Sequence, residues 1–100
     1  MSRDDTHRYL IAYDIPDDRR RDRLAKCLQR HGDRVQYSVF VIDASPARLL
    51  RLETEIHDIA LITEDSVLIC DLGISKSVED SRFRTLGRSR RITPSGSVIL

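Results

Sequence analysis

The chain has 100 residues, of which 40% are hydrophobic and 33% are charged, and its formal net charge is +1. This length predicts a single domain over residues 1–100 with a modest core, so a dimer that shares apolar surface is a reasonable expectation. The sequence has no apolar run near the ~20 residues of a membrane helix, and its polar start lacks the apolar segment of a secretory signal. We therefore expect a cytoplasmic protein without a membrane segment.

Basic residues gather in two stretches, residues 19–34 and 76–91, which flank an acidic stretch over residues 43–71. All but two of the 17 basic residues are arginine. Arginine holds phosphate through two hydrogen bonds at once, which lysine does not. A folded chain with this distribution would present a basic face suited to nucleic acid. A GC-rich genome would also favour arginine, although it explains the clustering less well.

The first predicted element is a strand over residues 8–15, which is apolar on both faces until it reaches Asp14. Such a strand is central in its sheet and covered on both sides. Pro16 marks the turn that follows it. Residues 18–31 then predict a helix with a narrow apolar stripe and a basic, solvated face. Gly32 is a candidate for the residue that ends this helix.

Residues 34–43 are β-branched and aromatic, and together they are long for one strand. A tight break near Tyr37 and Ser38 would divide them into a short hairpin, in which residues 34–36 pair with residues 38–43.

A second helix is predicted from residue 46 to near residue 60, with Ser45 as its N-cap. Residues 66–72 form another strand that is apolar on both faces until Asp71, and Gly73 ends it. The order is βαββαβ, which is the α+β ferredoxin-like arrangement with both helices on one face of the sheet. Because the strands look apolar on both faces, we expect the open face to be covered by a second copy of the same sheet.

The predicted core spans residues 8–73, and residues 74–100 form a basic C-terminal segment. The chain ends in an apolar run at residues 97–100. We interpret this run as a short strand added to a sheet edge, of this chain or of its dimer partner. The alternative is a frayed tail.

The two cysteines, Cys27 and Cys70, lie in patterns typical of buried positions. This fits a reducing cytoplasm, and their spacing indicates neither a disulfide framework nor a zinc site. The three histidines lie apart along the chain. A lone histidine is more often a surface group than a catalytic one.

Three carboxylates end predicted strands, namely those of Asp14, Asp43 and Asp71. Asp14 and Asp71 should not form a pair, because antiparallel neighbours place them at different edges. One aspartate is a poor metal site, but two copies of Asp14 related by a two-fold axis would be a better one. Mg²⁺ accepts one or two carboxylates and completes its octahedron with water and phosphate oxygens. The alternative is that Asp14 only precedes or caps a helix.

Several segments in order over residues 9–73 resemble the CRISPR-associated protein two family, the small partner of the CRISPR integrase in spacer acquisition. The most specific is Arg34-Val35-Gln36-Tyr37-Ser38-Val39-Phe40, at the right distance from Tyr13-Asp14-Ile15. The others are Asp17-Asp18-Arg19-Arg20-Arg21, Leu24 and Leu28, Gly32, and Asp65-Ser66-Val67-Leu68-Ile69.

The resemblance implies a homodimer with its sheets packed face to face, in which Asp14 of each protomer is the catalytic and metal-binding residue for Mg²⁺ or Mn²⁺. It implies a metal-dependent endonuclease that cleaves single-stranded RNA, duplex DNA or both, and that acts in CRISPR adaptation with the integrase. The alternative is a catalytically silent dimer that binds duplex DNA and bridges the integrase.

The family's positions near substrate correspond here to Tyr13, Arg20, Arg21, Arg23, Arg34 and Phe40. In the bridging role, the arginines that would bind DNA are Arg88, Arg90 and Arg91. Tyr13 and Phe40 could equally be core aromatics. An RNA-recognition module on the same fold is a weaker alternative, because the paired aromatics that stack bases are missing. A toxin endoribonuclease of related fold also stays open.

Overall fold

The structure is a computed structural model, and it describes residues 5–88. The element order is β1 (His7–Asp14), α1 (Asp18–Gln29), β2 (Gly32–Gln36), β3 (Val39–Ala44), α2 (Pro46–Ile59) and β4 (Ser66–Ile74). Two short 3-10 helices follow, η2 (Ser75–Ser77) and η3 (Asp80–Arg82). The predicted βαββαβ order and the α+β class are confirmed.

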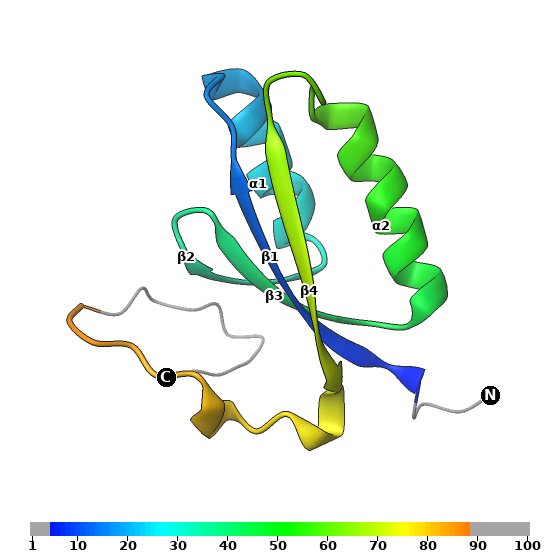
Figure 1. The fold of residues 1–100 in the computed structure, drawn as a ribbon, viewed down its shortest axis with the longest axis vertical. Coiled ribbons are helices and arrows are strands. Elements are labelled where there is room, and N and C mark those ends of the chain that lie inside the picture. The colour runs from blue at the N-terminus through cyan, green and yellow to red at the C-terminus, as the bar shows by residue number, and fades with distance from the viewer. Residues whose placement is uncertain (1–4, 89–100) are drawn as a thin grey trace.

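The strands form one four-stranded sheet in the order β2-β3-β1-β4 (Figure 1). β1 pairs antiparallel with both β3 and β4, so that Ile11 lies opposite Phe40 on one side and Ile69 on the other. The central place predicted for β1 is therefore confirmed. β4 forms one edge of this sheet in the part of the chain that the structure describes.

One face of the sheet packs against both helices. In β1, Tyr9, Ile11 and Tyr13 alternate with less buried neighbours, as the two-residue period of a strand requires. Burying a large apolar side chain contributes roughly 1.5–3 kcal/mol, so this layer holds the helices on the sheet. The core joins these side chains to Phe40 and Ile42 of β3, Leu24 and Leu28 of α1, and Leu52 and Ile56 of α2.

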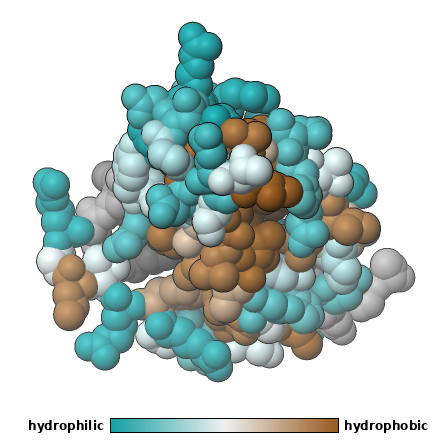
Figure 2. Space-filling model, turned by 45° about the horizontal axis from the view of Figure 1, so that its top comes forward, coloured by the Kyte–Doolittle hydropathy of each residue, from teal (hydrophilic) through white to brown (hydrophobic). Residues whose placement is uncertain are grey.

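The opposite face of the sheet is also apolar, and neither helix covers it. Leu10 and Ala12 of β1 lie on this face beside Leu68 of β4, which is 59% exposed. Figure 2 shows apolar side chains gathered near the centre of the face in view, with hydrophilic side chains around them. Cys70 shares the open face and is exposed, whereas Cys27 is buried. The expected burial is thus correct for Cys27 and wrong for Cys70.

Helix α1 begins after an aspartate cap and ends earlier than predicted. The carboxylate of Asp17 accepts a hydrogen bond from the backbone N–H of Arg20 at 2.9 Å, which satisfies one free donor of the first turn. The helix ends at Gln29, and Gly32 does not terminate it but begins β2. A Cβ on Gly32 would lie 2.4 Å from the carbonyl oxygen of Val41. Glycine is required there because β2 and β3 approach each other closely.

The hairpin and the second helix agree closely with the predictions made from the sequence. Tyr37 and Ser38 form the turn between β2 and β3, so the predicted break is confirmed. The Ser45 hydroxyl accepts a hydrogen bond from the backbone N–H of Arg48 at 3.2 Å, which confirms it as the N-cap of α2. Pro46 then occupies the first turn, where its missing N–H costs nothing.

Strand β4 continues past Gly73, which was expected to end it. Arg8 lies opposite Gly73 and Tyr9 lies opposite Asp71, so Leu72 is an extra residue in a bulge. Gly73 has a φ of +108°, which glycine adopts at little cost. The glycine therefore bends the strand towards η2.

The segment after β4 is held to the sheet through Val78, which is buried and whose carbonyl accepts a hydrogen bond from Arg8 Nη1 at 3.2 Å. The strand predicted at residues 97–100 lies outside the described residues. Within residues 5–88, no helix is long and apolar enough to cross a membrane.

We expect Gly32→Ala to lower the free energy of unfolding by about 1–3 kcal/mol, because the added methyl group overlaps the backbone of β3. Urea denaturation monitored by circular dichroism measures this. Gln36→Ala, at the exposed end of the same strand, is the matched control and should change stability by less than about 0.5 kcal/mol. Equal stability of the Gly32 variant and the wild type would contradict the tight contact.

Candidate functional site

Asp14 is the last residue of β1 and lies opposite Ser66, the first residue of β4. Its side chain follows the alternation of the strand, so it belongs to the same face as Ala12 and not to the helix-covered face of Tyr13. Asp14 is exposed. The structure thus places a carboxylate at the lip of the sheet and on the side that the helices leave open.

The other two strand-end acids already have side-chain partners. Asp43 accepts two hydrogen bonds from the guanidinium of Arg8, at 2.8 and 3.1 Å. The Asp71 carboxylate lies 2.9 Å from His7 Nδ1 and accepts a hydrogen bond from the backbone N–H of Gly73 at 2.8 Å. The hydrogen bond from His7, assisted by that of Gly73, lowers the pKa of Asp71. Both carboxylates serve to hold the end of the sheet opposite to Asp14.

Asp14 differs from these two acids. Within residues 5–88, no side chain forms a hydrogen bond or ion pair with its carboxylate. Asp71 lies opposite Tyr9, far along β1 from Asp14, which confirms that the two acids do not pair within one chain. An exposed carboxylate with no partner in this part of the chain is available to a cation.

The β2–β3 turn packs beside the end of β1. The backbone N–H of Tyr13 donates to the carbonyl of Ser38 at 3.1 Å, and the Tyr13 hydroxyl donates to the carbonyl of Tyr37 at 3.5 Å. Arg34 donates to the same Tyr37 carbonyl through Nε at 3.0 Å and Nη2 at 2.6 Å. A fixed guanidinium therefore lies close to the residue that precedes Asp14.

The aromatic residues near the lip belong to the core. Phe40 is fully buried and Tyr13 is 6% exposed, with their rings stacked at a centroid distance of 6.3 Å. The Arg34 guanidinium covers the Phe40 ring at 5.5 Å. Burial raises the pKa of Tyr13, and the nearby Arg34 opposes this shift. Their burial supports the core alternative for both rings, and of the two only Tyr13 carries a polar group towards the turn.

Arg20 forms a clamp between α1 and the turn before β4. Its guanidinium donates to the Asp65 carboxylate at 2.7 and 3.0 Å and to Glu64 at 3.1 Å. The Asp65 side chain is fully buried and also accepts the backbone N–H of Leu61 at 2.8 Å. The hydrogen bond from Arg20 lowers the pKa of Asp65. Contact of Arg20 with nucleic acid stays a prediction.

The remaining basic residues predicted to lie near nucleic acid differ in their exposure and in their partners. Arg21 Nη1 donates to the carbonyl of Ile15 at 2.8 Å and its guanidinium pairs with Asp18, so it braces the loop that follows Asp14. Arg23 is exposed, and its side chain forms no hydrogen bond or ion pair within residues 5–88. Arg88 is exposed. Arg90 and Arg91 lie outside the described residues.

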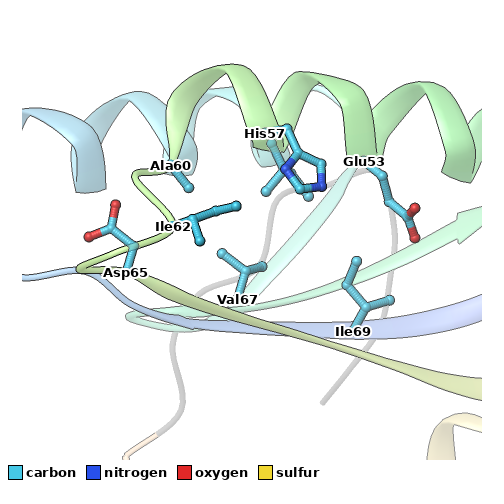
Figure 3. A pocket seen from close by; sticks show the side chains of 8 residues that line it. Glu53, His57, Ala60, Ile62, Asp65, Val67 and Ile69 are labelled. Carbon is cyan, nitrogen blue, oxygen red and sulfur yellow. The ribbon is translucent and has the colours of Figure 1, made fainter.

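A shallow groove lies elsewhere, between α2 and β4 (Figure 3). It encloses about 210 Å³ and is lined mainly by apolar side chains, including Ile62, Val67 and Ile69, with His57 at its rim. Asp14 does not line this groove. The candidate site at the exposed end of β1 is therefore separate from this groove.

The fold and the site define a small ferredoxin-like α+β protein with an exposed aspartate at the end of its central strand. The family model for CRISPR associated protein Cas2 matches residues 7–79 of this chain. The chain therefore belongs to the Cas2 family. The family resemblance and the ferredoxin-like fold predicted from the sequence are both confirmed.

Individual relatives agree with this assignment. The CRISPR-associated endoribonuclease Cas2 3 of Synechocystis is 48% identical over 59 residues, which are 59% of this chain and 64% of that protein. The CRISPR-associated endoribonuclease Cas2 of Geobacter sulfurreducens is 38% identical over 73% of this chain and 77% of its own length. The crystal structure of Streptococcus pyogenes Cas2 superposes with a TM-score of 0.72 and 28% identity, over 80% of this chain and 99% of that one.

Sequence reasoning missed the partners that shape this lip. The Tyr37 carbonyl, which anchors Arg34, was treated only as part of a turn, and Ser66 was not placed beside Asp14. Antiparallel pairing brings the start of β4 beside the end of β1, but only the observed register places Ser66 opposite Asp14. The Arg34 contact depends on side-chain conformation and has no sequence signal.

We expect Arg20→Ala to destabilise the fold in a pH-dependent manner. The folded-state pKa of Asp65 lies below its ordinary value of 3.8, so the ion pair stabilises the protein above that pH. The contribution is lost as the pH falls through the lowered pKa. Urea denaturation of wild type and variant should therefore show a stability difference at pH 7 that shrinks below pH 3.8. A difference that stayed constant into strong acid would contradict the clamp.

Proposed function

We propose that this chain is a metal-dependent endonuclease of CRISPR adaptation, which acts as a homodimer alongside the CRISPR integrase. Its substrates are single-stranded RNA, duplex DNA or both. It cleaves a phosphodiester bond of the nucleic acid at a site formed by the Asp14 residues of the two protomers. The observation that carries the proposal is the carboxylate of Asp14, exposed and without a partner in residues 5–88, on the apolar face that the helices leave open. The endoribonuclease names of the relatives from Synechocystis and Geobacter support the hydrolytic reaction on RNA.

The open face of the sheet supports the homodimer. Leu10, Ala12 and Leu68 form an apolar surface on this face, and leaving it in water forfeits roughly 25 cal/mol per Å². If a second copy of the sheet covers this face and a two-fold axis relates the two copies, both copies contribute the same residues to the interface. Because Asp14 lies on this face, the same operation brings two Asp14 carboxylates to a shared lip.

Two carboxylates at one lip repel each other unless a cation or a shared proton neutralises them. The donor set is hard oxygen, which suits Mg²⁺ or Mn²⁺, and the open lip leaves room for water and phosphate ligands. A bound Mg²⁺ would polarise a phosphoryl oxygen and lower the pKa of a coordinated water.

The chain's own residues prepare the lip for a phosphate. Arg34 is held at the turn by two hydrogen bonds to Tyr37, which leaves other N–H groups of its guanidinium available. Arg21 is braced against the carbonyl of Ile15, directly after Asp14. Both guanidinium groups are already ordered, so they would meet a phosphodiester at a smaller entropic cost than free side chains. Each offers only the N–H groups that its present partners leave unused, because Arg21 pairs with Asp18 and Arg34 covers Phe40 on the helix-covered face.

We expect Asp14→Asn to reduce metal-dependent cleavage to background while the fold and the dimer remain intact, because the side chain is exposed and Asn has nearly the same size. Labelled single-stranded RNA and duplex DNA, each with Mg²⁺ and with chelator, measure the activity. The matched control is Asp17→Asn, which makes the same chemical change three residues away. Asn is as good an N-cap as Asp, so cleavage by this control should persist.

Undiminished cleavage by Asp14→Asn would end the catalytic proposal. Cleavage of RNA alone, of DNA alone or of both by the wild type would name the substrate. If the folded wild-type dimer cleaves neither, the second function below is the one that the structure supports.

The second candidate is a dimeric bridge that binds duplex DNA and the integrase without cleavage. It is favoured by basic side chains that are exposed and form no side-chain hydrogen bond or ion pair with another of residues 5–88. Arg19 and Arg23 of α1 and Arg88 after η3 are exposed, in contrast to the clamped Arg20 and Arg21.

For this function we expect Arg88→Ala to weaken duplex DNA binding and to reduce the slope of log K against log salt by about one, because one phosphate contact is lost. Adding Ala at Arg90 and Arg91 should reduce the slope further. Lys26→Ala, which removes an exposed α1 charge paired with Asp22, is the control. Fluorescence anisotropy at several salt concentrations makes the comparison. An unchanged affinity and slope in the arginine variants would contradict DNA binding by this segment.

A further inference from the structure

Three side chains converge where α1 meets α2, on the helix side of the sheet and away from the open face. Cys27 lies in the last turn of α1, His31 follows that helix, and Glu55 comes from α2. Glu55 Oε1 is 3.2 Å from Cys27 Sγ and 3.1 Å from His31 Nε2. All three candidate ligand atoms lie within 4.8 Å of one another.

The three side chains differ in their access to solvent. Cys27 is 1% exposed, the His31 side chain is 16% exposed and the Glu55 side chain is 44% exposed. The thiol thus forms the floor of the cluster and the carboxylate forms its opening. An ion from solvent would reach the cluster past Glu55 without opening the core.

We propose that Cys27, His31 and Glu55 form a binding site for a tetrahedral, thiophilic divalent cation such as Zn²⁺, with water as the fourth ligand. Zinc bond lengths of about 2.3 Å to sulfur and about 2.0–2.1 Å to nitrogen and oxygen imply ligand separations of roughly 3.4–3.6 Å in a tetrahedron. The separations of Cys27 Sγ and His31 Nε2 from Glu55 Oε1 are shorter by a few tenths of an ångström. The ligand atoms of Cys27 and His31 lie within 4.8 Å of each other, so the side chains would rotate to close around the ion.

Without a metal, hydrogen bonds connect the three side chains of the cluster. The thiol of Cys27 donates to Glu55, and burial with this hydrogen bond raises the thiol pKa to about 11. Metal binding replaces the thiol proton, which leaves to solvent as the sulfur becomes a thiolate ligand. Arg30 Nη2 lies 3.8 Å from Glu55 Oε1 on a side chain that is 64% exposed, so the guanidinium is free to turn towards water.

The site is chemically distinct from the lip at Asp14. A thiolate and an imidazole select Zn²⁺ and similar ions, whereas carboxylate and water select Mg²⁺ or Mn²⁺. A bound ion would link the end of α1 to the middle of α2 and stabilise the helix layer by mass action. The inference does not depend on the proposed nuclease function, and its test involves no cleavage.

Titration of the metal-free full-length protein with Co²⁺, a spectroscopic substitute for Zn²⁺, tests the site. We expect one Co²⁺ per chain to produce a thiolate-to-cobalt charge-transfer band and the intense visible bands of tetrahedral cobalt. Zn²⁺ should displace the cobalt and raise the melting temperature. Oxygen ligation at Asp14 would produce neither spectral feature.

Cys27→Ser should abolish the charge-transfer band, and the matched control Cys70→Ser should retain it. Because Cys27 is buried, its variant must be shown to fold by circular dichroism. Glu55→Gln keeps the thiol and should weaken Co²⁺ binding by about tenfold or more. Absence of the band from the folded wild type, its persistence in folded Cys27→Ser, or unchanged affinity in Glu55→Gln would overturn the proposal.

Discussion

The alternation of β1 is the constraint on which the site depends. Tyr9, Ile11 and Tyr13 are buried against the helices, and the two-residue period of a strand then assigns Asp14 to the opposite face. A register slip of one residue would turn the carboxylate towards the core and the tyrosines towards water, so the hydrophobic layer excludes it. The same layer that stabilises the domain thus presents the acid at the uncovered face.

Arginine side chains hold the neighbouring elements around this strand end, through an ion pair at Arg20 and hydrogen bonds at Arg34. Arg20 and the buried Asp65 fix the start of β4, while Arg34 fixes the β2–β3 turn through the Tyr37 carbonyl. These arginines lie in the basic stretch that suggested nucleic-acid binding, yet the fold uses much of their hydrogen-bonding capacity. A basic sequence therefore overstates the charge that is free to meet a phosphate.

The sequence predicted most of the fold, because local rules decide most of it. Element order, the Ser45 cap and the place of Asp14 at a strand end follow from periodicity and capping chemistry. The predictions were wrong or incomplete where contacts between distant segments of the chain determine the structure. Gly32 resembles a helix terminator locally, but the backbone of β3 requires it. The exposure of Cys70 depends on which sheet face the helices cover, and Glu55 reaches Cys27 only because α1 packs beside α2.

The central claim is that Asp14 from both protomers of a homodimer forms one site. Mixing wild-type chains with Asp14→Asn chains, under conditions that exchange subunits, and measuring cleavage at fixed total protein tests it most directly. If both carboxylates are needed, an equal mixture should retain roughly one quarter of the wild-type activity, because only dimers in which both protomers carry Asp14 cleave. Activity of roughly one half, in proportion to the wild-type chains, would show that each protomer acts alone and would contradict the shared site.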